Sequence, residues 1–216
     1  MSVRIPSRAA RVATCAALCA APLAAPLGAP LAAQQPAQSS TRPAPAAEQV
    51  AAAVLPLPAE LRESATVLGY DAGGKLVTLR EGSGAMRCLA DDPALPQYHV
   101  ACYHKALEPF MARGRALRAE GVKGDQVDTV RFREIAANKL ALPRTGGALY
   151  TLTSTTGGYD AASGKIAGAR PLFVYYMPFA TAATAGISEK ASRSEPWLMY
   201  PGTPKAHVML VGTMAP

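Results

Sequence analysis

The residues best suited to chemistry are concentrated in one stretch, residues 88–104. It holds two of the four cysteines, two of the three histidines (His99 and His104) and the adjacent acids Asp91 and Asp92. Thiols, imidazoles and carboxylates can form disulfides, bind metal ions or move protons. The sequence therefore raises three kinds of chemistry here, and each needs other elements to position it.

The first is a disulfide between Cys88 and Cys102. These are the only cysteines that follow the N-terminal region. An even pair in an exported protein usually forms a disulfide. The bond would close a loop of about 15 residues, for which the chain-entropy model gives about 3 kcal/mol of stabilisation. The Cys-x-x-Cys spacing typical of redox-active pairs is absent, which favours a structural bond.

The second is a metal site built from His99, His104, Glu108 and His207. His104 and Glu108 are four residues apart and would be neighbours on a helix that began early enough. However, the spacing of these residues and the cysteines matches no standard zinc arrangement, and a disulfide would consume both sulfurs. We therefore favour no metal and predict no cofactor, with the histidines in surface or packing roles.

The third is acid–base catalysis, for which the candidates are His104, Glu108 and Asp92. An Asp-Asp pair before proline more often caps a solvated turn. Gly82-Ser83-Gly84 lacks the full Gly-x-Ser-x-Gly elbow of a hydrolase. Because neither motif is specific, the sequence leaves open whether the protein is an enzyme and favours a binding protein.

The N-terminal region has the composition of an export signal followed by a linker. Residues 1–11 carry three arginines and no acid, and residues 12–21 are apolar. This order is typical of a secretory signal peptide, with cleavage expected near Ala33. Residues 34–55 are rich in Ala and Pro and are expected to form a flexible linker. We therefore predict bacterial-type export to the periplasm or the outside, with no transmembrane segment after cleavage.

Residues 56–216 are predicted to form one α+β domain. Apolar periodicity predicts two main helices, 106–121 and 125–138, on one side of a mostly antiparallel sheet of about five to seven strands. Arg131 and Arg133 are expected on the solvated side of the second helix. The segment expected to be the most buried strand is 171–179, because it is apolar on both faces. The strand-forming runs are 66–70, 75–80, 148–153, 171–179, 197–200 and 207–211, with shorter extended pieces at 85–90 and 98–102.

Charge and composition exclude some functions and leave three open. The formal net charge of +7 would fall to +4 on removal of residues 1–33, and only 6% of residues are aromatic. A dense basic stripe or a base-stacking platform is therefore absent from the sequence, so we predict no nucleic-acid partner. The preferred hypothesis is an exported binding or accessory domain for an unknown protein or small-molecule ligand, with a binding surface formed by the loops at 88–104 and 181–196. The alternatives are a small exported hydrolase or metal-dependent enzyme that uses His99, His104, Glu108 and His207, and an envelope-associated structural protein.

Overall fold

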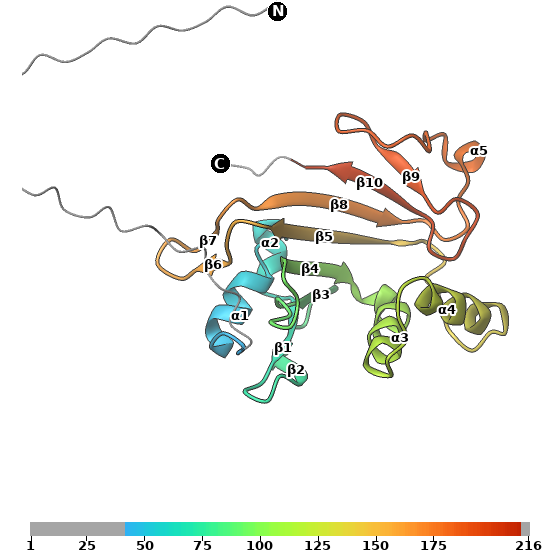
Figure 1. Ribbon diagram of the computed structural model, residues 1–216. Coiled ribbons are helices and arrows are strands. Elements are labelled where there is room, and N and C mark those ends of the chain that lie inside the picture. Colours follow the sequence, from blue (N-terminus) through green and yellow to red (C-terminus); the bar gives the residue numbers. More distant parts are fainter. Residues whose placement is uncertain (1–41, 213–216) are drawn as a thin grey trace, which may run out of the picture. The chain divides into compact units, whose positions relative to one another are not determined.

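A mostly antiparallel sheet of eight strands organises residues 42–212, which are the residues described by a computed structural model of the chain (Figure 1). The strand order is β2-β1-β3-β4-β5-β8-β10-β9, and β1 and β3 form its parallel pair. A second, two-stranded sheet, β6-β7, packs Ile166 against Val100 and Leu152 of the large sheet. The strands are β1 Thr66–Tyr70, β2 Leu76–Arg80, β3 Met86–Leu89, β4 Tyr98–His104, β5 Gly147–Ser154, β6 Tyr159–Asp160, β7 Lys165–Ile166, β8 Arg170–Tyr176, β9 Trp197–Met199 and β10 His207–Val211.

Helices cover both faces of this sheet. Successive residues of a strand point to opposite faces. On β4, Cys102 packs with the residues of α1, whereas its neighbour Tyr103 packs with Phe110 of α3. Two layers of helix therefore enclose the middle of the sheet. The helices are α1 Ala46–Ala53, α2 Ala59–Arg62, α3 Glu108–Ala119, α4 Gln126–Ala136 and α5 Ala182–Ala185, with a 3-10 turn, η1 Lys105–Leu107, before α3.

The predicted α+β class is confirmed, and the sheet is larger than predicted. The expected strands between 66 and 211 all form, and the two extended pieces become β3 and β4. The two main predicted helices appear as α3 and α4, which pack on each other and on one face. All described residues, 42–212, fall in one compact unit. That the chain has a single folded domain stays a prediction.

Two expectations about burial are wrong. Strand β8 is not the most buried strand, because Tyr175 is 37% exposed, while four of the five residues of β1 are buried. Arg131, expected on the solvated side of its helix, is only 5% exposed. Its guanidinium stacks on the Phe110 ring, donates to the Phe110 carbonyl and pairs with Asp128, whose second oxygen accepts from Lys205. Burial of this charge is possible because Asp128 of the same helix neutralises it and the Phe110 carbonyl oxygen of α3 accepts a hydrogen bond from it.

Helix α1 lies within the range expected to be a flexible linker, 34–55. Its sequence is rich in alanine, the strongest helix former, and begins directly after Pro45. Ala52 and Ala53 are buried against the sheet, so the small side chains let the helix approach closely. The alanine content of this segment led to the prediction of a linker, whereas in the structure the same alanines form a helix that packs on the sheet. The leader 1–33, the cleavage site at Ala33 and the start of the linker lie outside the described residues.

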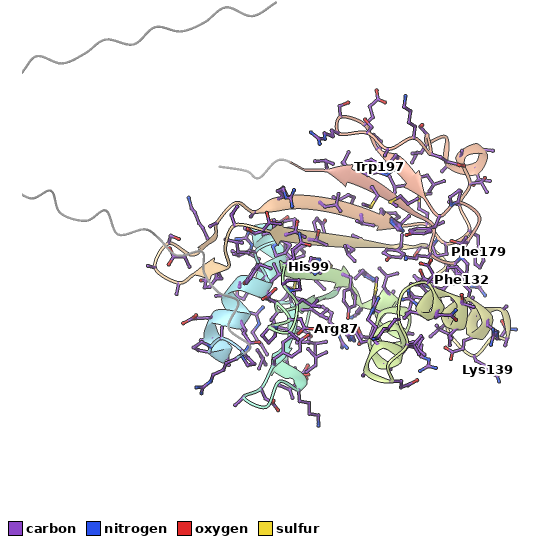
Figure 2. The ribbon with its side chains drawn as sticks, in the orientation of Figure 1. Arg87, His99, Phe132, Lys139, Phe179 and Trp197 are labelled. Carbon is purple, nitrogen blue, oxygen red and sulfur yellow. A yellow bond between two sulfur atoms is a disulfide. The ribbon has the colours of Figure 1, made fainter. Side chains whose placement is uncertain are left out.

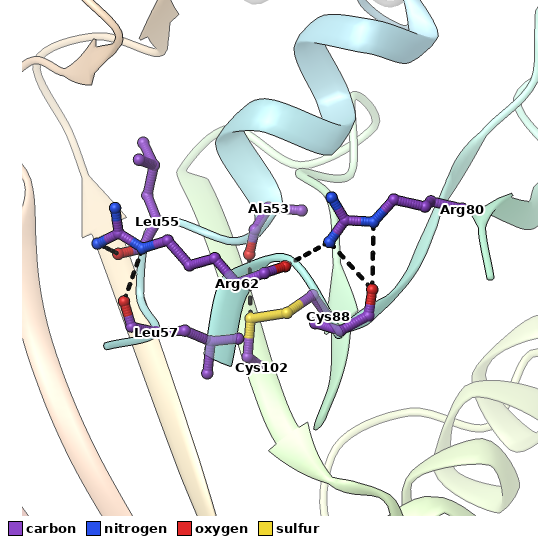
Figure 3. Close-up of a disulfide and its surroundings, with 8 residues drawn as sticks. Ala53, Leu55, Leu57, Arg62, Arg80, Cys88 and Cys102 are labelled. Carbon is purple, nitrogen blue, oxygen red and sulfur yellow. Dashed lines mark hydrogen bonds between the residues drawn. A yellow bond between two sulfur atoms is a disulfide. The ribbon is translucent and has the colours of Figure 1, made fainter. Parts of the chain in front are cut away.

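The predicted disulfide joins Cys88 of β3 to Cys102 of β4 at directly opposite positions of the two strands (Figure 3). Both cysteines are fully buried beneath α1, and the Cys102 sulfur lies 3.0 Å from the carbonyl oxygen of Ala53. A disulfide sulfur carries no proton, so this is a close packing contact. Arg62 donates to the carbonyl oxygens of Leu57 and Leu55 and closes the turn between α1 and α2. The disulfide thus holds together the two ends of the connection between β3 and β4, residues 89–97.

Among residues 42–212, no helix is long and apolar enough to span a membrane.

Candidate functional site

A cavity of about 370 Å³ opens at the end of the sheet where β4 begins and β5 ends. Three segments line it: residues 42–49 at the start of α1, residues 91–98 between β3 and β4, and residues 154–159 after β5. Tyr98 and Ser154 are directly opposite each other in the sheet and lie among its lining residues. A concave site with a few polar groups is the usual form of a small-ligand site.

The adjacent acids Asp91 and Asp92 have different roles. Asp92 Oδ1 accepts the N–H of Ala94 at 3.0 Å and so caps the turn, as the sequence suggests for an Asp-Asp pair before proline. Asp91 lines the cavity, and its Oδ1 accepts the N–H of His99 at 2.7 Å. That bond ties the start of the loop to β4. The carboxyl that faces the cavity is therefore Asp91 rather than the catalytic candidate Asp92.

Burial raises the pKa of the Asp91 carboxyl to about 6. The hydrogen bond from His99 N–H lowers this pKa, and the neighbouring charge of Asp92 raises it. No ion pair of Asp91 occurs within residues 42–212. Asp91 is thus a half-buried carboxyl that lacks a cationic partner in this part of the chain and changes charge close to neutral pH.

Two tyrosines provide the aromatic surface of the cavity. Tyr98 is the first residue of β4, and Gly158 passes over its ring so closely that a Cβ there would lie 3.2 Å from ring carbons. Tyr159 follows directly and also lines the cavity. Burial and the charge of Asp91 raise the pKa of Tyr98, which keeps its hydroxyl protonated. Tyr98 can therefore offer a ring face and a hydrogen-bond donor.

Ser154 is not available as a nucleophile. Its Oγ donates to the Ala167 carbonyl oxygen at 2.5 Å and accepts the N–H groups of Thr156 and Gly157 at 3.1 and 3.3 Å. The side chain is 1% exposed. Its role is to fold the 154–157 turn against residue 167, which shapes one wall of the cavity.

Glu48 reaches the cavity because Gln49 anchors α1 to the sheet. The Gln49 amide donates to the carbonyl oxygens of Ala44 and Tyr70 at 2.7 and 2.8 Å and accepts the N–H of Tyr70 at 2.7 Å. Gly69 leaves room for this contact, since a Cβ there would lie 2.5 Å from the Gln49 oxygen. Gln49 is 6% exposed, so these bonds are sheltered from water. The anchor brings a second carboxylate, Glu48, to the cavity rim.

Glu108 belongs to an ion network on the opposite face of the sheet. It pairs with Arg87 of β3 at 3.0 Å and with Arg115 of α3 at 2.7 Å, and it accepts the hydroxyl proton of Tyr103. Arg115 also donates to that hydroxyl at 2.8 Å. Burial raises the pKa of Tyr103, which stays a phenol. This network ties α3 to β3 and β4.

The structure does not bring together the three histidines that the sequence offered as candidate site residues. His99 is exposed on β4, where its backbone N–H binds Asp91. His104, at the other end of β4, accepts the N–H of Ala106 through Nδ1 and caps η1. His207 of β10 donates to the Lys205 carbonyl oxygen at 2.7 Å and is 6% exposed. Figure 2 marks His99 near the start of β4, far from Trp197 on edge strand β9.

Strands β5 and β8 lie between His104 and His207, which separates them by roughly 14 Å at the usual strand spacing. Glu108 points to the arginine network. Over residues 42–212, no group of three His, Cys, Asp or Glu side chains is placed to hold a metal ion. The loop at 181–196 follows β8 at the end of the sheet where His104 lies, whereas the 91–97 loop lies at the other end, so these two loops do not share a surface.

The sequence located part of the cavity and missed the rest. The stretch 88–104, predicted to carry the chemistry, includes the lining residues Asp91 and Tyr98. However, the residues named as candidates there were Asp92 and the histidines. Glu48 and Tyr159 also line the cavity. Glu48 lies in the range expected to be a linker, and Tyr159 lies in a turn to which the sequence assigned no function. A signal for Glu48 was available in the helix-forming run around it. None was available for Tyr159.

Comparisons with known proteins give no relative: no family model, no curated protein and no solved structure matches this chain.

Proposed function

We propose that this protein is an exported binding domain that holds a small polar molecule in the cavity between α1, the 91–98 segment and the 154–159 turn. The observation that carries this proposal is Asp91. A carboxyl with a pKa of about 6 and no ion pair within residues 42–212 faces a cavity of about 370 Å³. Holding a carboxyl in this state costs stability, and such costs are typical of functional sites.

The remaining lining supports binding of a molecule with both polar and apolar parts. Tyr98 and Tyr159 supply ring surface, and Glu48 and Asp91 supply charge. Polar groups fix the orientation of a ligand, while apolar surface supplies most of the affinity. The sheet, the disulfide and the Gln49 anchor hold all three lining segments in place before a ligand arrives, which limits the entropy cost of binding.

The test uses three probes of similar size, phenethylamine, 2-phenylethanol and 2-phenylacetate, titrated into the full chain. Amide resonances of the 91–98 and 154–159 segments should shift in ¹H–¹⁵N spectra with at least one probe, at millimolar concentration or below. Resonances of β9 and β10, at the far edge of the sheet, serve as the internal control. Absence of any cavity shift with all three probes contradicts the binding function.

Export rests on the sequence of the N-terminal region. The basic and then apolar order of residues 1–21, followed by small residues near Ala33, supports cleavage and release to the periplasm or outside. Fractionation of the producing cell, with intact mass of the product, tests this proposal. We expect a product shortened by about 33 residues in the exported fraction. An uncut chain in the cytosol contradicts it.

An enzyme that uses Asp91 is the second candidate. A carboxyl with a pKa of about 6 can donate and accept protons near neutral pH. In this case Asp91 would act with the Tyr98 hydroxyl, not with the three histidines and Glu108 that the sequence proposed. Turnover of a bound molecule that is lost in Asp91→Asn, while binding is kept, would favour this candidate.

A further inference from the structure

The charges that line the cavity are unequal. The ionisable groups with full charges are Glu48 and Asp91, which are acidic, and Arg42, which is basic and exposed at the first described position. Asp91 uses one oxygen to accept a backbone N–H, and its other oxygen has no partner among residues 42–212. A cation in the cavity would meet two carboxyls.

The aromatic lining adds a second attraction for a cation. An ammonium group near the face of a tyrosine ring gains from the ring quadrupole, by about 0.5–1 kcal/mol at exposed sites and more when shielded from water. Tyr98 and Tyr159 lie beside the same space as Asp91, and the charge of Asp91 is close enough to raise the pKa of Tyr98. Carboxylate and ring therefore act on one region of the cavity.

A metal ion fits this lining poorly. Hard cations such as Ca²⁺ take six to eight oxygen ligands and Mg²⁺ takes six. Within residues 42–212 no three acidic, histidine or cysteine side chains are grouped for this purpose. An anion would have to approach two carboxyls and depend on Arg42 alone. An organic cation suits both the charge and the apolar area.

We propose that the ligand is an organic amine, whose ammonium group pairs with Asp91 and Glu48 while its apolar body packs on Tyr98 and Tyr159. This inference rests on the proposed binding function and specifies the ligand class for the same cavity. The ammonium would supply the cationic partner that Asp91 lacks in the described part of the chain. Polyamines, amino sugars and amine-bearing aromatic compounds all have this chemistry.

The test measures affinities of the full chain for phenethylamine, 2-phenylethanol and 2-phenylacetate by the same titration. The three probes share a phenyl ring and differ in charge. We expect phenethylamine to bind at least tenfold more tightly than the other two. Equal or tighter binding of 2-phenylethanol or 2-phenylacetate overturns the amine inference but leaves the binding function standing. No binding of any probe overturns both.

The second readout is pH. The amine stays protonated between pH 5 and 7, while a carboxyl with a pKa of about 6 goes from mostly neutral to mostly charged. Binding should therefore be about tenfold weaker at pH 5 than at pH 7. Asp92, Tyr70 and Tyr98 are the titratable groups close enough to interact with the charge of Asp91, and Glu48 and Arg42 line the same cavity. His99 is bound to Asp91 through its backbone N–H, so the variant His99→Gln should keep the same pH dependence.

Variants assign the effect to the carboxyl. Asp91→Asn keeps an oxygen for the His99 N–H and should weaken phenethylamine binding at pH 7 about tenfold and remove its pH dependence. Glu48→Gln should weaken binding without removing the pH dependence. Asp160→Asn, which removes an exposed carboxylate outside the cavity lining, is the matched control and should bind as the parent does. Unchanged binding in both Asp91→Asn and Glu48→Gln overturns the inference.

Discussion

Replacement of Asp91 by asparagine should stabilise the protein at neutral pH. The pKa of Asp91 rises from its ordinary value of 3.8 to about 6, mainly because the carboxyl is buried. The folded protein therefore binds this proton more tightly than the unfolded chain does. As pH rises from 3.8 to above 6, the unfolded chain ionises first and stability is lost. Asparagine has no such proton and avoids the loss, while its side-chain oxygen can still accept the His99 N–H.

The size of the gain follows from the two pKa values. The difference between 3.8 and about 6 corresponds to about 3 kcal/mol at 1.36 kcal/mol per pKa unit. Asp91 is only half-buried and borders the cavity, so solvent screens part of this penalty. We expect Asp91→Asn to gain about 1 to 2 kcal/mol at pH 7.5 and close to nothing at pH 3.5, where both forms are neutral.

Urea unfolding of parent and variant at pH 3.5, 5, 6 and 7.5 measures this difference directly. The gain should grow through pH 5 and 6 and level off above 7. A carboxyl titration of the parent by NMR should place the pKa of Asp91 near 6. A variant that is less stable than the parent at pH 7.5, or a gain that does not change with pH, refutes the reasoning.

Asp160→Asn is the control of opposite sign. The Ser163 hydroxyl and the Ala162 N–H both hydrogen-bond to this exposed carboxylate and lower its pKa. Its charged form is favoured by folding, so its contribution is present above the unfolded pKa and is lost as pH falls. The asparagine variant should therefore gain no stability at pH 7.5. A gain equal to that of Asp91→Asn would show that the effect reflects net charge alone.

Three further predictions test the supports of the site. Reduction of the Cys88–Cys102 bond, or its replacement by two alanines, should cost about 3 kcal/mol in urea unfolding. Thiol titration of denatured, unreduced protein that begins at Gln34, and so lacks Cys15 and Cys19, should find neither remaining sulfur reactive; two reactive thiols contradict the bond. Gly69→Ala should cost about 1 to 3 kcal/mol, since its Cβ would lie 2.4 Å from Leu79 Cδ1 of β2 and 2.5 Å from Gln49 Oε1 of α1, whereas Gly73→Ala, with its nearest atom at 3.3 Å, should cost less; equal costs contradict this close packing of β2 and α1 around Gly69. Burial lowers the pKa of His207, so stability that depends on its neutral form should fall as pH drops below 6.5; His207→Asn should flatten this fall in urea unfolding between pH 7 and 5, and an unchanged slope contradicts it.

Local patterns were enough to predict most elements. Apolar spacing placed α3 and α4, and β-forming runs placed the strands from Thr66 to Val211. The disulfide followed from cysteine count alone, because only two cysteines remain after residue 33. The pattern failed where composition had two meanings. The low complexity of an alanine-rich segment predicts a flexible linker, whereas the helix propensity of alanine predicts a helix. Only the presence of a sheet surface on which the helix can pack decides between the two.

The candidate site could be predicted only in part. Asp91 and Tyr98 lie in the stretch that the sequence singled out, because acids and aromatic residues gather there. Which of two adjacent acids faces the cavity depends on a single hydrogen bond, from His99 N–H to Asp91. The histidines were candidates because of their type, yet His99 and His104 lie at opposite ends of β4, and two strands separate β4 from His207 on β10.

The sequence by itself determined the class of fold, the sulfur pair and the stretch that carries Asp91, since these follow from periodicity and residue type along the chain. Only the tertiary structure decided that Glu48, Asp91 and Tyr159, which are far apart in the sequence, border one cavity, and that Glu108 does not. The physical reason is that contacts between distant segments depend on strand order and register, which shift a side chain to another face or another end of the sheet without changing any local pattern.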